Sequence, residues 1–103
     1  MTMDFRILRK IIYSDEYVGF NLKQHDEIKK VTDELKLPLM SRLAEFYAND
    51  VDYGSLELDN LLKEIDKIRE KLQDAESIKL LDDLKELIKK AITEKKTIRV
   101  LTD

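Results

Sequence analysis

The stretch LDNLLKEIDKIREKLQDAESIKLLDDLKELIKKAI, residues 58–92, decides the fold. Its leucines and isoleucines recur every three or four residues on both sides of a polar break at residues 73–77. This period places apolar side chains along one face of each of two helices. Two helices joined by a short connection are expected to pack as an antiparallel hairpin that forms the main core. The central positions of its two stripes are Leu61, Ile65, Leu84 and Ile88.

The composition agrees with a helical chain. Of 103 residues, 43% are hydrophobic and 40% are charged, with two Gly and one Pro. The apolar share is enough for one small core, and the length fits a single compact domain over residues 1–103. Few turn-forming residues and many charged ones favour long helices over a β-sandwich or a disordered linker.

Several classes of site and location are excluded by the sequence. The chain has no Cys, so it can form no disulfide, zinc–thiolate site or thiol nucleophile. Its apolar runs are far shorter than the ~20 residues of a membrane span, and no secretory signal is visible. We expect a cytoplasmic protein that uses no cofactor and no metal.

The two ends of the chain favour strands. Residues 3–13 and 97–102 are rich in β-branched and aromatic residues, and we expect them to pair. The first segment also fits a helical stripe, and periodicity alone does not separate the two. Residues 17–20 are a candidate third strand, with residues 14–16 as the preceding turn.

Between these ends the sequence predicts two further helices. Asn21 and Gln24 form a capping-box pattern at the start of a helix over residues 21–35. Pro38 opens a second helix that should fray near Asn49, and residues 49–54 form a loop. The expected fold class is α+β and mainly helical: an antiparallel helical hairpin and two further helices, with a small sheet from the chain ends.

The charges are segregated along the chain although the net charge is only -3. Residues 45–66 contain seven acidic residues against the single base Lys63, and residues 85–99 contain six basic residues against two acidic ones. The acidic residues are Glu45, Asp50, Asp52, Glu57, Asp59, Glu64 and Asp66. Solvated helix faces can account for both runs. A face that binds a basic protein can also account for the acidic run.

Tyrosines in the acidic segment favour the binding face, because tyrosine gives a rigid amphipathic contact at low entropy cost. Tyr47 falls on the apolar face of its predicted helix, and Tyr53 falls in the predicted loop. Tyr53 is therefore the better contact candidate.

Catalytic signatures are absent from the sequence. The single histidine, His25, lies at the edge of an apolar stripe, and we expect it to have a structural or surface role. Residues 49–54 faintly resemble a calcium-binding loop, but with Asp50 at position one Gly54 falls at five instead of six. We expect a protein without enzymatic activity.

The segment Leu37–Leu43 through Tyr47, the run Asn49–Gly54 and the following Leu-rich acidic helix resemble small immunity proteins of bacterial toxin systems. The resemblance covers roughly residues 37–72. It implies a stoichiometric inhibitor that binds a toxin domain without catalysis. Some nuclease-specific members of this class bind through acids and tyrosines. The residues that would take this part here are Asp50, Asp52, Tyr53, Glu57 and Asp59.

Two alternatives remain open. The helical hairpin could build a structural or regulatory oligomer, which an exposed apolar stripe on residues 58–92 would favour. The basic residues of 85–99 could bind nucleic acid, although the near-neutral total charge makes this partner less favoured.

Overall fold

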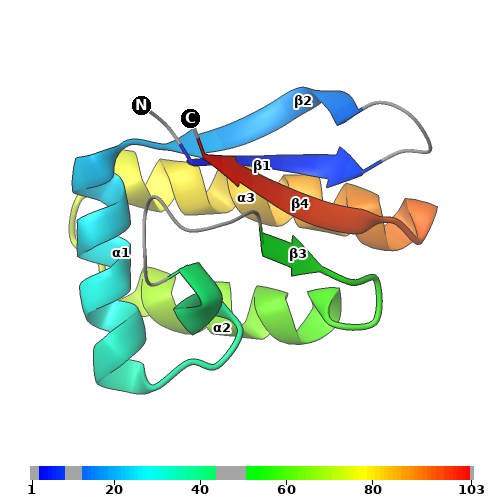
Figure 1. Ribbon diagram of the computed structural model, residues 1–103. Helices are drawn as coiled ribbons and strands as arrows, with labels where there is room; N and C mark the ends of the chain where they lie inside the picture. Colours follow the sequence, from blue (N-terminus) through cyan, green and yellow to red (C-terminus); the bar gives the residue numbers. More distant parts are fainter. Residues whose placement is uncertain (1–2, 9–12, 44–50, 103) are drawn as a thin grey trace.

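The computed structural model of the chain describes residues 3–8, 13–43 and 51–102. It shows the predicted mainly helical α+β fold (Figure 1). In chain order the elements are β1 (Met3–Leu8), β2 (Tyr13–Phe20), α1 (Leu22–Leu35), the 3-10 helix η1 (Met40–Leu43), β3 (Val51–Tyr53), α2 (Leu58–Lys71), α3 (Ala75–Glu94) and β4 (Thr97–Thr102).

The two chain ends form the middle of a four-stranded antiparallel sheet with the order β2-β1-β4-β3. β1 pairs with β4 from Met3↔Thr102 to Leu8↔Thr97, so the predicted pairing of the two ends is confirmed. β4 also pairs with β3, with Tyr53 opposite Ile98. The C-terminal strand is therefore an inner strand with a hydrogen-bonded neighbour on each side.

The second strand is longer than predicted. β2 begins at Tyr13, so the predicted turn at residues 14–16 is wrong. The pairing register shifts between Arg6 and Leu8, and this shift brings Tyr13 opposite Leu8. β2 lies at an edge of the sheet, where a strand tolerates charged residues that are typical of a turn in the sequence. The end of the predicted first strand, residues 9–12, lies outside the described residues.

The predicted helix from Pro38 is replaced, in its described part, by the short helix η1. The carboxylate of Glu64 on α2 accepts hydrogen bonds from the Leu39 and Met40 amides, at 3.1 and 2.8 Å. A side chain from another element thus satisfies donors that would otherwise start an α-helix. The rest of this prediction, including Ala44, Phe46 and Tyr47, lies outside the described residues.

The helix boundaries at α1 agree with the capping pattern. The Asn21 side chain accepts from the Gln24 amide at 2.8 Å, and the Gln24 side chain accepts from the Asn21 amide at 3.0 Å. α1 ends at Leu35 and is capped by Lys36, which adopts a left-handed conformation with φ 54°. The reciprocal cap of Asn21 and Gln24 fixes the point at which the chain leaves β2 and enters the helical layer.

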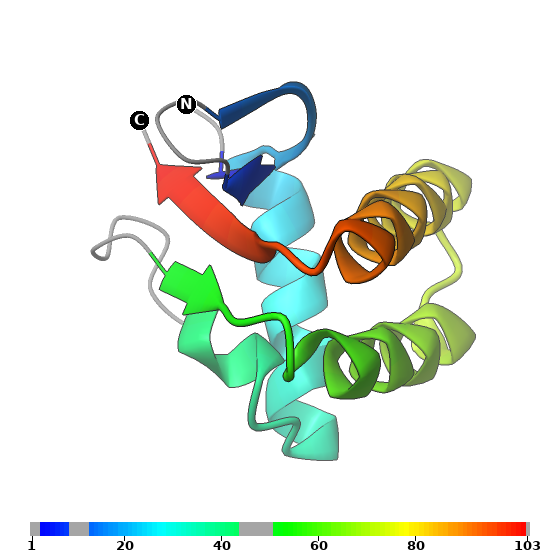
Figure 2. The ribbon, with the colours of Figure 1, turned by 90° about the vertical axis from the view of Figure 1, so that its right-hand side faces the viewer.

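The helices cover one face of the sheet (Figure 2). α2 and α3 form the predicted antiparallel hairpin, and α1 crosses the end of the hairpin at which α2 and α3 are connected (Figures 1 and 2). Alternate strand residues such as Phe5 and Val100 are buried against the helices, whereas Arg6 and Arg99 are on the opposite face. The predicted central residues Leu61, Ile65, Leu84 and Ile88 are all fully buried, which confirms the hairpin as the main core. Within the described residues, the helices are all too short or too polar to cross a membrane.

Candidate protein-binding surface

Tyr53 belongs to the core. Residues 51–53 form β3 instead of the predicted loop, and strand alternation turns Tyr53 toward the helices. Its ring is fully buried and its hydroxyl donates to the Leu39 carbonyl at 2.7 Å. Burial also raises the pKa of this hydroxyl. The prediction that Tyr53 is an exposed contact residue is therefore wrong.

Asp52 lies on the open face of the sheet, paired with a base from the other end of the chain. Arg99 Nε donates to Asp52 Oδ1 at 2.7 Å, and Arg99 Nη2 donates to Oδ2 at 2.9 Å. These hydrogen bonds lower the pKa of the Asp52 carboxyl, against a smaller opposing effect of burial. The charge of Asp52 is thus largely balanced within the molecule.

Glu57 closes the turn between β3 and α2. Its Oε1 accepts from the Gly54 amide at 3.1 Å, and its Oε2 accepts from Arg42 Nη2. The Arg42 hydrogen bond is the main cause that lowers the pKa of Glu57. Arg42 also donates to the Asp52 carbonyl at 3.3 Å and lies 5.6 Å from the centre of the Tyr53 ring. Glu57 and Arg42 together hold this turn against the sheet.

The remaining acids of the segment point to different places. Glu64 is buried beneath η1, and Asp66 pairs with Lys85 on α3. Asp59 is exposed in the first turn of α2 and has no partner among the described residues. Asp50 and Glu45 lie outside the described residues. The described acids of the segment therefore do not form one continuous unpaired acidic face.

Leu56 is the exposed apolar residue of this region. It lies in the turn between β3 and α2, and 94% of its surface is accessible. It lines an open groove of about 480 Å³ between this turn and the end of α1. Other residues that line the groove include Leu35, Lys36, Pro38, Asn60, Lys63 and Lys67. We call Leu56, Glu57, Asp59 and this groove together the Leu56 surface. It combines an exposed apolar side chain with charges of both signs.

Sequence reasoning missed Leu56, although the sequence contains a signal for it. Residues three and four positions ahead share a helix face with a given residue. For Leu56 those positions are Asp59 and Asn60, both polar. Leu56 therefore does not belong to the apolar stripe that starts at Leu58, and this offset marks it as a surface residue.

His25 has the structural role predicted for it. The ring is 4% exposed, and Nε2 donates to the Leu43 carbonyl. His25 on α1 thereby fixes the end of η1. Among residues 3–8, 13–43 and 51–102, no three side chains of the His, Cys, Asp and Glu type are grouped to hold a metal ion.

Comparisons with protein-family models, with curated proteins and with solved structures found no match to this chain. The inference of function therefore depends on the geometry of the chain itself.

Proposed function

We propose that the chain is a small cytoplasmic protein-binding module that acts by occlusion. In this proposal it is an immunity protein that neutralises a bacterial toxin domain by forming a stoichiometric complex. The exposure of Leu56 is the observation that carries the proposal. The resemblance of residues 37–72 to immunity proteins suggests the kind of partner.

An almost fully exposed leucine is a suitable anchor for a partner. Burying such a side chain in a complex contributes about 1.5–3 kcal/mol. Leu56 projects from a turn that Glu57 and Arg42 hold in place, so little order has to be gained on binding. The adjoining groove offers room for an apolar side chain of the partner.

The acidic residues retain a supporting role in this proposal. Asp59 adds an exposed negative charge three residues from Leu56, and Asp50 precedes β3 in the sequence. Charges at the rim of an interface mainly accelerate encounter with a partner of opposite sign. Asp52 and Glu57 contribute less field because Arg99 and Arg42 neutralise them. We therefore propose a basic surface on the toxin domain that meets Asp59 first.

The two alternative functions have less support from the geometry. The apolar stripes of α2 and α3 are buried in the core, and the exposed large hydrophobic residues of the described chain are Tyr17, Leu22 and Leu56. An oligomer built through the hairpin therefore lacks the exposed stripe it would need. The basic segment is also partly neutralised, because Lys85, Lys89 and Arg99 each pair with an acid.

A growth assay tests the proposal. The reading frame next to the gene of this chain is expressed in a host cell, with and without the chain. We expect growth arrest by the neighbour alone, rescue by the parent chain and a one-to-one complex on gel filtration. Leu56→Asp should abolish rescue, and the control Leu22→Asp, at a half-exposed leucine of α1, should retain it. Rescue by both variants, or no toxicity of the neighbour, would contradict the proposal.

A further inference from the structure

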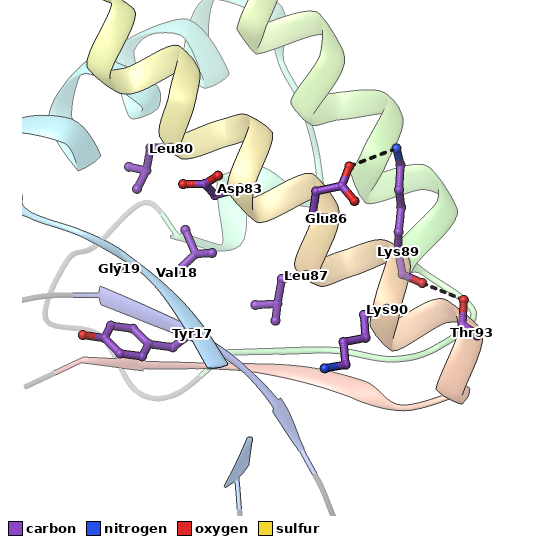
Figure 3. A pocket seen from close by; sticks show the side chains of 10 residues that line it. All are labelled: Tyr17, Val18, Gly19, Leu80, Asp83, Glu86, Leu87, Lys89, Lys90 and Thr93. Carbon is purple, nitrogen blue, oxygen red and sulfur yellow. Dashed lines mark hydrogen bonds and ion pairs between the residues drawn. The ribbon is translucent and has the colours of Figure 1, made fainter. Parts of the chain in front are cut away.

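A second groove lies on the other side of the molecule, between β2 and α3 (Figure 3). Its volume is about 930 Å³, and it is open to solvent. Tyr17, Val18 and Gly19 line it from the strand, and Leu80, Asp83, Leu87 and Lys90 are among the α3 residues that line it. Figure 3 shows the side chains of Val18 and Leu87 between the strand and the helix.

One wall of this groove is the outer edge of the sheet. β2 pairs with β1 on one side, and within residues 3–8, 13–43 and 51–102 no strand pairs with its other side. Every second residue of an antiparallel edge strand directs both its N–H and C=O groups outward. Such an edge is a ready template for one more strand.

The helix supplies an apolar strip opposite this edge, of which Leu80 is partly exposed and Leu87 is already buried. Leu80 and Leu87 are seven residues apart on α3, so they lie on the same side of the helix, about 10 Å apart along its axis. An extended chain advances about 3.3 Å per residue and directs alternate side chains to one face. A strand beside β2 would thus place alternate side chains over this strip.

The charges of the groove select a direction for that strand. Asp83 lies toward the start of α3 and Lys90 toward its end. β2 ends beside α1, and Ser77 at the start of α3 donates to Glu27 of α1 at 3.0 Å. β2 and α3 therefore run in opposite directions (Figure 1). A strand antiparallel to β2 would run with α3 and pass Asp83 before Lys90.

We propose that this groove binds an extended segment of another protein as a fifth antiparallel strand beside β2. On the face turned to α3 the segment has apolar residues, a basic residue opposite Asp83 and an acidic residue four positions further on, opposite Lys90. Asp83 and Lys90 lie about 10 Å apart along the helix axis, and four positions, about 13 Å of extended chain, is the nearest spacing of that length or more that keeps both side chains on one face. Backbone hydrogen bonds give affinity, and the alternate side chains give specificity. This site is separate from the Leu56 surface and does not depend on it.

Asp83 and Lys89 in this groove already have partners on the helix, and these two pairs are easily exchanged. Asp83 pairs with Lys79 at 3.1 Å, and Lys89 pairs with Glu86 at 3.5 Å, all at exposed positions. Exposed pairs of this kind are worth at most about 1 kcal/mol. A bound segment can therefore recruit Asp83 at small cost.

Selection from a displayed library tests this inference. A phage library of random dodecapeptides is panned against the immobilised full-length chain. We expect enriched peptides with apolar residues at alternate positions, a base near the start and an acid four positions later. Amide hydrogen exchange of the complex should then show slower exchange in residues 17–20. Absence of enrichment, or slower exchange confined to other elements, would overturn the proposal.

Charge variants check the direction of the strand. Lys90→Glu and Asp83→Lys should each weaken a selected peptide roughly fivefold in fluorescence anisotropy, because each loses one opposite-charge contact. Lys71→Glu, at an exposed position at the end of α2, should leave the affinity unchanged. An effect of Lys71→Glu as large as that of Lys90→Glu, with a change of opposite sign for Asp83→Lys, would mean that only the net charge matters, which contradicts the assigned site.

Two further controls distinguish this groove from the Leu56 surface and from a contact between two copies of the chain. The Leu56→Asp variant should bind the selected peptides as tightly as the parent chain. Peptide binding in the groove can therefore be confirmed even if the toxin-binding proposal fails. Analytical ultracentrifugation should show a monomer. A concentration-dependent dimer that slows exchange in the same β2 residues would make the groove a self-association surface, and the proposal would be wrong.

Discussion

Arg99 on β4 donates two hydrogen bonds, of 2.7 and 2.9 Å, to the carboxylate of Asp52 on β3, which lies 47 residues away in the sequence. Lys85 of α3 likewise pairs with Asp66 of α2. The acidic middle and the basic end of the chain thus neutralise each other in part. The opposite charges of the two segments therefore form ion pairs that hold the segments together in the folded chain.

Asp52→Asn should lower stability at neutral pH and have little effect in acid. The folded-state pKa of Asp52 is lowered by Arg99, so its contribution is full above the unfolded pKa of about 3.9 and is lost as the pH falls through the folded value. Asp52 is 45% exposed, which limits the effect to about 1 kcal/mol. Urea unfolding from about pH 7 down to about pH 2 measures it. The control is Asp59→Asn, and an Asp52 effect equally large in acid would contradict this account.

Glu64→Ala should cost about 2–3 kcal/mol of unfolding free energy, because two backbone amides, one buried and one partly buried, lose a charged acceptor. Glu64→Gln keeps one acceptor oxygen and should cost less. Glu70→Ala, at an exposed position on the same helix, is the control. Chemical denaturation gives the three values, and a Glu64→Ala value no larger than that of the control would show that these hydrogen bonds do not support η1.

Ile65→Ala and Leu84→Ala should each cost about 2–5 kcal/mol, because both side chains are fully buried between the helices and the sheet. Leu56→Ala removes the same kind of side chain from an exposed turn and should change stability by less than about 0.5 kcal/mol. Denaturation midpoints at constant slope provide the comparison. Similar losses at all three positions would contradict the assigned core.

Deletion of residues 97–103 should abolish cooperative unfolding, because β4 has a partner strand on each side. Circular dichroism during heating checks this outcome. Ile98→Val is the milder variant, with an expected cost of about 0.5–1.5 kcal/mol at this fully buried position. A truncated chain that melts cooperatively near the parent temperature would show that β4 is dispensable.

Local signals in the sequence were sufficient for much of the fold. The Asn21 and Gln24 pattern gives the start of α1 because both hydrogen bonds lie within one turn. The spacing of apolar residues alone predicts the buried faces of α2 and α3. The two β-rich ends could be predicted to pair because each needs a partner strand. These features depend on neighbours in sequence or on composition.

The candidate site could be predicted only in part, because its contacts are long-range. β3 has three residues, too few for an alternation pattern, and its direction toward the core is set by pairing with β4. Nothing near Asp52 in sequence indicates Arg99, and nothing near Glu64 indicates the amides of Leu39 and Met40. The count of charges along the chain therefore predicts one acidic face, whereas in the folded chain these acidic residues lie in different places and several are paired with bases.

The affinity of Leu56→Ala for the toxin domain tests the central claim most directly. The dissociation constant is measured by titration calorimetry with the purified product of the neighbouring reading frame, for the parent chain and the variant. An anchor worth about 2 kcal/mol predicts roughly thirtyfold weaker binding with an unchanged unfolding midpoint. A dissociation constant within about twofold of the parent value would show that Leu56 lies outside the interface and would contradict the claim.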